Sequence, residues 1–168
     1  EVELPDLPYE AATRTILLAE SASAFDEFIE SGKTAELTAP EDHYGGYART
    51  AVLAKDYLRA LRIRGLIARA IDEVLTGYDA LVAPSRPTVA PGIEVEFRSA
   101  VGGGVSDVMG AIGNGAGLPA ISVPNGFGQR GLPTGVQFMG RAYEENAVLA
   151  VARAYQSLTA WHTQHPEG

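Results

Sequence analysis

Glycine is concentrated in one part of the chain, between Gly102 and Gly140. Twelve of the nineteen glycines lie in this run, where they alternate with short apolar stretches. Glycine loses much conformational entropy on folding and contributes no side chain. Such a density therefore persists where backbone turns with positive φ, packs against backbone or lines a site closely. The run predicts the floor of a pocket and not a linker.

The hydrophobic pattern around this run predicts a layered α/β fold of alternating helices and strands. A first helix is expected after Pro8 with Gly32 as its stop, and a second, about 28 residues long, is expected to end near Gly77. A closing helix is expected from about Glu144 to His162. The remaining expected elements are a short helix at 107–112 and strands at 79–84, 120–124 and 135–139.

The expected strands differ in their surroundings. The run at 79–84 is continuously apolar, which is typical of a strand buried on both faces of a parallel or mixed sheet. The other two are joined by a segment rich in glycine and asparagine, which predicts a hairpin. The apolar helix positions expected to face the core include Phe25, Leu53, Ile67, Ile71, Val148, Ala152 and Leu158.

Composition excludes several classes of function. The chain has no cysteine, which excludes disulfides, thiolate catalysis and iron–sulfur clusters. Its net charge of −8 argues against direct binding of nucleic acid or anionic membranes. No apolar run approaches the roughly 20 residues that span a bilayer, and no signal peptide is recognisable. We expect a cytoplasmic protein without membrane contact.

Familiar catalytic and cofactor patterns do not fit. The Gly113–Gly117 stretch lacks the spacing of a dinucleotide fingerprint and the ending of a P-loop. No Gly-x-Ser-x-Gly elbow occurs, and no histidine pair has metal-binding spacing. The three histidines, His43, His162 and His165, are expected to be solvated, and we expect neither a metal nor a cofactor.

Six of the thirteen cations lie between Arg49 and Arg69 in the second expected helix. This stripe could meet RNA, but a solvated helix face paired with nearby acids fits the acidic composition better.

Asp107 is the one acid inside the glycine-rich run. It could bind an amine or amide group of a ligand. It could equally cap the short helix that follows it, because aspartate favours helix N-termini. The residues alone leave both interpretations open.

Several ordered blocks of this chain resemble the amidase signature family. The segment from Asp79 to Thr88 is similar to the family's Asp-x-Leu-x-x-Pro-Thr-x-Pro motif. The run from Asp107 to Pro119, followed by AISVPNG and GLPTGVQFMG, is similar to the family's Asn-Leu-x-Gly-Leu-Pro-Ala-x-Ser-x-Pro and Gly-Leu-Pro-x-Gly-x-Gln-x-x-Gly blocks. The resemblance extends more loosely through the N-terminal helices.

This resemblance implies that residues 1–168 form the C-terminal portion of an amidase-signature domain. The implied fold is the C-terminal part of an α/β/α layered fold with a mixed central sheet flanked by helices. In family members that serve as the glutaminase subunit of tRNA-dependent amidotransferases, an acid matching Asp107 helps bind the substrate's amino group. Asp107 and Asn114 are therefore the predicted substrate-binding residues for a small-molecule amide, and amidotransferase subunits are the implied partners.

The family's catalytic Ser, cis-Ser and Lys form an acyl-enzyme from an upstream segment that has no match in this chain. Lys33 and Lys55 lie in other contexts, so no catalytic residue is carried over. The chain also has Gly115 where the family usually has Leu, Gly110 where it often has Thr, and Ser85 in place of Thr. These changes are expected to widen or loosen the pocket.

The chain starts without Met, in a stretch that alternates acidic and apolar residues like the end of a strand. We expect a piece of a longer enzyme that is inactive by itself. The alternative is a truncated, non-catalytic binding module that keeps the pocket floor. Exposed sheet edges would then allow self-association.

Overall fold

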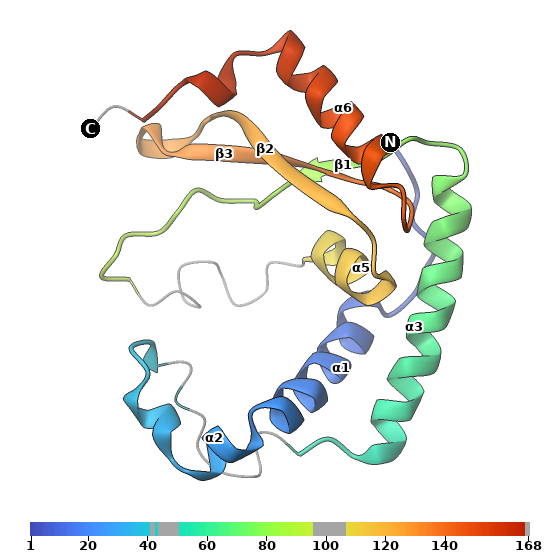
Figure 1. Ribbon diagram of the computed structural model, residues 1–168, viewed down its shortest axis with the longest axis vertical. Coiled ribbons are helices and arrows are strands. Elements are labelled where there is room, and N and C mark those ends of the chain that lie inside the picture. Colours follow the sequence, from blue (N-terminus) through green and yellow to red (C-terminus); the bar gives the residue numbers. More distant parts are fainter. Residues whose placement is uncertain (41–42, 44–50, 96–106, 167–168) are drawn as a thin grey trace.

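The computed structural model describes residues 1–40, 43, 51–95 and 107–166. Arg49 and the Gly102–Gly104 triplet of the sequence predictions lie outside these residues. The described elements form three layers, with one helix on one face of a sheet and a group of helices on the other (Figure 1). The predicted α/β class is confirmed.

The sheet has three strands in the order β1-β3-β2, and both pairings are antiparallel. In register, Met139 lies opposite both Leu81 and Ala120. The predicted hairpin is confirmed, with each of its strands longer than the sequence pattern indicated. The strands are β1 (Leu81–Pro84), β2 (Ala120–Phe127) and β3 (Pro133–Met139).

The predicted helices exist, with different bounds. The α-helices are α1 (Tyr9–Ala24), α2 (Asp26–Glu30), α3 (Ala54–Leu75), α5 (Val108–Ala116) and α6 (Glu145–Leu158). The short 3-10 turns are η1 (Lys33–Glu36), η4 (Gln129–Gly131) and η5 (Trp161–Thr163).

The single helix expected up to Gly32 is wrong, because the chain breaks at Phe25, whose φ is −112°. Phe25 is exposed rather than in the core. Asp26 and Glu27 follow it directly, and acidic side chains stabilise a new helix N-terminus. Propensity at this point therefore favours a restart, and no core packing opposes it.

Two other helix ends correct the sequence predictions. Leu53 is extended and exposed, so α3 has 22 residues instead of about 28. The chain leaves α6 at Thr159, with φ −134° and ψ 158°, so that Leu158 is 85% exposed. At both places the apolar side chain lies just beyond the reach of the packed helix face.

Two apolar clusters hold the layers together. The larger joins α1, α3 and α5 to one face of the sheet through Ile67, Ile71, Leu75, Ile112, Leu81 and Met139. The smaller joins α6 to the other face through Val123, Phe138, Val148 and Ala152. The predicted core positions on α3 and α6 are thus confirmed for Ile67, Ile71, Val148 and Ala152.

Burial of β1 on both faces is contradicted. Val82 is 61% exposed, although its cross-strand neighbour Phe138 is buried beneath α6. The reason is position in the sheet, because α6 packs over β2 and β3 while β1 lies at the edge.

Helix α5 lies closely against its neighbours because it is rich in glycine. A Cβ at Gly115 would lie 2.5 Å from Thr13 Oγ1 of α1, which is closer than real side chains approach. The helix ends at Gly117, whose φ of 72° is left-handed. The glycine-rich run therefore serves close helix packing at this point.

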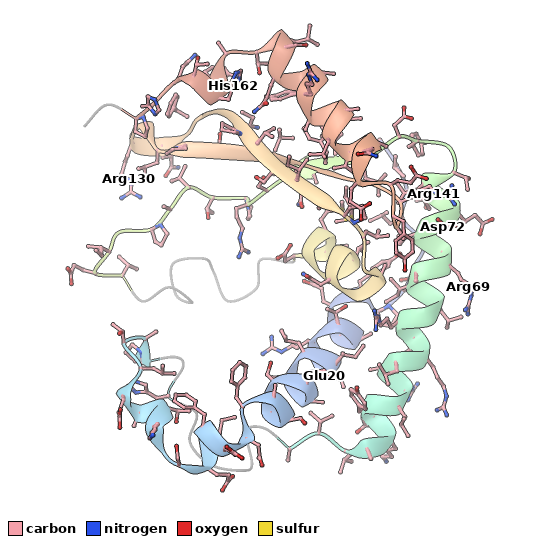
Figure 2. All side chains as sticks on the ribbon, viewed as in Figure 1. Glu20, Arg69, Asp72, Arg130, Arg141 and His162 are labelled. Atoms are coloured by element: carbon pink, nitrogen blue, oxygen red, sulfur yellow. The ribbon has the colours of Figure 1, made fainter. Side chains whose placement is uncertain are left out.

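Arg141 joins the end of β3 to α3. Its Nε and Nη2 donate to the two carboxylate oxygens of Asp72 at 2.8 and 3.0 Å, and both residues are labelled in Figure 2. These hydrogen bonds from Arg141 lower the pKa of the Asp72 carboxyl. No helix in the described ranges is both long and apolar enough to cross a bilayer.

Candidate functional site

The face of the sheet opposite α6, here called the inner face, changes from apolar to polar along the strands. Leu81 and Met139 are buried at one end of it, under the helical layer. Alternate residues of a strand share a face, so Gln137 and Ser122 continue the same side. The Gln137 amide nitrogen donates to the Pro84 carbonyl at 3.0 Å.

Two serine hydroxyls meet at this polar end. Ser85 Oγ and Ser122 Oγ lie 2.5 Å apart, on the two outer strands. They meet across Gly135 of the central strand, where a Cβ would lie 2.8 Å from Ser85 Oγ and 3.0 Å from Ser122 Oγ. The glycine therefore makes the hydroxyl pair sterically allowed.

Asp107 lies at the start of α5 and caps it. Its Oδ1 accepts a hydrogen bond from the Gly110 backbone N–H at 3.0 Å, and its own N–H donates to Glu10 Oε1 at 2.7 Å. Its Oδ2 lies 3.6 Å from Arg86 Nη1, and its side chain is still 56% exposed. The capping interpretation is confirmed, and the ligand-binding interpretation stays a prediction that this exposed carboxylate can meet.

Asn114 is linked to Asp107 through one residue. Its Nδ2 donates to the Gly110 carbonyl at 2.8 Å, while the Gly110 N–H is held by Asp107. Seven residues separate the two side chains, which places them on one side of the helix about 10 Å apart along its axis. The structure thus brings the two predicted residues to one side of α5 without direct contact.

Side chains from α1 and α3 fix the position of α5. Thr13 Oγ1 donates to the Ala111 carbonyl at 3.0 Å, and Arg64 Nε donates to the Gly115 carbonyl at 2.7 Å. The sequence pattern places Arg64 on a solvated face paired with acids, but it donates to this backbone carbonyl instead. Together with Glu10, these contacts hold Asp107 and Asn114 in place.

A hollow of about 540 Å³ lies beside Arg86, between the segment that follows β1 and the β2–β3 turn. Arg86 and Arg130 are among its lining residues, and no Asp or Glu is among the described ones. Arg130 Nη2 donates to the Ala90 carbonyl at 3.0 Å across the hollow. Figure 2 shows Arg130 at the far end of the hairpin, pointing toward the segment after β1.

Sequence reasoning missed Glu10 and Arg86. Glu10 is 97 residues from Asp107, so no local pattern connects them. Arg86 had a weak signal, since it lies between two prolines directly after a strand. Of the predicted solvated histidines, His162 and His165 are exposed, whereas a ring nitrogen of His43 lies 2.7 Å from the Leu37 carbonyl.

The sequence matches the family model described as Amidase over residues 4–149. Among characterised relatives, a Glutamyl-tRNA(Gln) amidotransferase subunit of Chloroflexus aurantiacus is 46% identical over 110 residues, which are 66% of this chain and 22% of that protein. The corresponding subunit of Legionella pneumophila is 37% identical over a similar span. The chain therefore spans about a fifth of the length of these relatives.

Solved structures agree in fold. The corresponding Glutamyl-tRNA(Gln) amidotransferase subunit of Thermotoga maritima superposes with a TM-score of 0.67 at 28% identity, covering 95% of this chain and 34% of that one. The peptide amidase of Stenotrophomonas maltophilia gives 0.66 at 26% identity, covering 99% and 37%.

Proposed function

Because this chain belongs to the Amidase family, we propose that it forms part of the substrate site of a longer enzyme that attacks the carbonyl carbon of a carboxamide. The enzyme either hydrolyses the amide or transfers its nitrogen. The proposal covers both outcomes, since amidotransferase subunits and a peptide amidase are among the similar proteins.

The chemistry of this proposal is covalent and uses residues outside the chain. A Ser, cis-Ser and Lys set from an upstream segment would form an acyl-enzyme, which divides one difficult step into two easier ones. The residues of the present chain would bind and orient the substrate, which reduces the entropic part of the barrier.

The observation that carries the proposal is the placement of Asp107. Its carboxylate is exposed, and its position is fixed by the Gly110 N–H and by Glu10. A carboxylate held in this way can accept a charge-assisted hydrogen bond from an ammonium or amide N–H of a substrate. Asn114, tied to the same Gly110, would contribute its side-chain carbonyl farther along the helix.

The implied partners follow from the relatives. Since similar proteins are subunits of Glutamyl-tRNA(Gln) amidotransferases, other amidotransferase subunits are the proposed partners in a cytoplasmic assembly. The net charge of −8 argues that any tRNA would be held mainly by those partners.

The test is Asp107→Asn in a longer protein that carries the family's Ser, cis-Ser and Lys segment. Asparagine can still cap α5 but lacks the charge. For an amide substrate with a free amino group, kcat/KM should fall by roughly tenfold, the effect of one lost charge-assisted hydrogen bond. An amide without an amino group should be affected little, and the exposed Asp26→Asn variant on α2 serves as control.

Two results would contradict the proposal. One is an equal loss for both substrates, which would make Asp107 only structural. The other is amide hydrolysis by the purified 168-residue chain, since the proposed nucleophile lies outside it.

A non-catalytic binding module is the second candidate, and one observation favours it. The edge of β1 away from β3 has no strand partner among the described residues, and Val82 beside it is largely exposed. Such an edge can pair with another chain, including a second copy of this one. A longer protein without amide hydrolysis, in which Asp107→Asn changes nothing, would favour this function.

A further inference from the structure

We propose that the hollow beside Arg86 and Arg130 binds the carboxylate end of an organic ligand whose hydrocarbon part lies along the hollow's apolar wall. The inference rests on the proposed function in one respect: in the longer enzyme, this carboxylate would belong to the amide substrate. The favoured substrates would then be amides that carry a carboxylate.

The charge of the hollow is the first argument. The whole chain has a net charge of −8, yet the described residues around the hollow include two arginines and no acid. A local excess of positive charge in an acidic protein attracts anions to that place. The guanidinium fork also matches the geometry of a carboxylate, with which it forms two parallel hydrogen bonds.

Arg130 is fixed in position while most of its donors remain available. Its backbone is left-handed, with φ of 59°, a conformation uncommon for residues other than glycine. One guanidinium nitrogen donates to the Ala90 carbonyl on the opposite wall. A guanidinium has five N–H donors, so this bond orients the group and leaves donors for a ligand.

Arg86 is held only weakly in its present position. Its Nη1 lies 3.6 Å from Asp107 Oδ2, beyond ordinary hydrogen-bond length, and its side chain is 61% exposed. Exposed ion pairs of this kind contribute little free energy. The guanidinium can therefore turn to an incoming carboxylate at small cost, and Asp107 becomes free for a second group of the same ligand.

The apolar wall distinguishes an organic carboxylate from an inorganic anion. Pro87, Val89, Pro91 and Val95 line the hollow together with the arginines. Its volume of about 540 Å³ lies within the range of small-molecule sites. A hydrocarbon chain against these side chains adds hydrophobic burial that phosphate or chloride cannot provide.

The experiment measures binding of hexanoate and of its neutral analogue hexanamide to the 168-residue chain by NMR titration. Hexanoate should bind at least roughly tenfold more tightly than hexanamide, the effect of a charged hydrogen bond. Arg130→Met and Arg86→Met should each remove most of this preference. Arg153→Met, on the exposed surface of α6, is the matched control and should leave it unchanged.

Arg130→Lys provides a second variant in case methionine at this position prevents folding. It keeps the charge but lacks the fork, and it should retain only part of the preference. Equal binding of hexanoate and hexanamide would overturn the proposal, as would binding of inorganic phosphate at the same residues without binding of hexanoate.

This experiment is independent of the enzyme proposal, because hexanoate has no amide and no hydrolysis is measured. Hexanoate binding that depends on the arginines would stand even if Asp107→Asn had no effect on amide turnover. Failure of hexanoate to bind would likewise leave the role of Asp107 untouched.

Discussion

The two faces of the sheet are built for different purposes. On the α6 face, Val123 and Phe138 are buried against Val148 and Ala152. On the inner face, Met139 is only 1% exposed under the helical layer, but Ser122 farther along is exposed. One face therefore contributes mainly to stability, whereas the other contributes stability at one end and polar surface at the other.

Helix α5 marks the boundary on the inner face. Its residue Ile112 is fully buried in the cluster with Leu81 and Met139, while Asp107 at its first turn is exposed. The same helix thus closes the apolar end and presents the predicted binding residue beside the polar end. Changes on either side of this boundary should have different effects.

The largest difference is expected between two adjacent residues of β3. Phe138→Ala should lower the free energy of unfolding by roughly 3–5 kcal/mol, because it leaves a cavity beside Tyr155, whose ring centroid is 5.7 Å away. Gln137→Ala on the inner face should cost about 1 kcal/mol, since it loses one hydrogen bond to Pro84. Urea unfolding of both variants measures the difference, and similar losses would refute the contrast between the faces.

A smaller effect is expected where α5 meets α1. Gly115→Ala should lower the free energy of unfolding by about 1–3 kcal/mol, because the new methyl group would overlap Thr13 Oγ1. The matched control is Gly65→Ala within α3, where the nearest atom, Arg69 Nη1, would be 3.8 Å away. There the better helix propensity of alanine should raise stability by about 0.5–1 kcal/mol. Thermal unfolding that shifts in the same direction for both would show that α5 has room to move.

The smallest effect concerns the link between the sheet layer and α3. Arg141 lowers the pKa of Asp72 from its ordinary value of 3.8. The pair therefore contributes stability above this value, and the contribution is lost as pH falls through the lowered pKa of the folded state. The stability difference between the wild type and Asp72→Asn should shrink between about pH 6 and about pH 2.

Arg141→Met tests the same link from the other side. It should narrow the difference from the wild type over the same pH range, and the double variant should add little to either single change, because both remove one interaction. Full additivity of the two changes in urea unfolding would show that the pair is not coupled.

The sequence by itself determined the α/β class, the hairpin and the existence of each long helix. These features follow from local periodicity and turn residues, as in the strands around Asn125-Gly126 and the stripe containing Ile67 and Ile71. It also identified the Asp107 cap as one of two interpretations, because capping depends on the three residues that follow.

Only the tertiary structure decided which apolar residues are covered. Phe25, Val82 and Leu158 have the same chemistry as buried residues, but no element lies over them in the described part of the chain. Tertiary structure also brought Glu10 and Arg86 to Asp107, and Arg130 to the segment after β1. Periodicity reports a residue's own element, whereas these contacts join residues far apart in sequence through packing of α5 against α1 and of the hairpin beside β1.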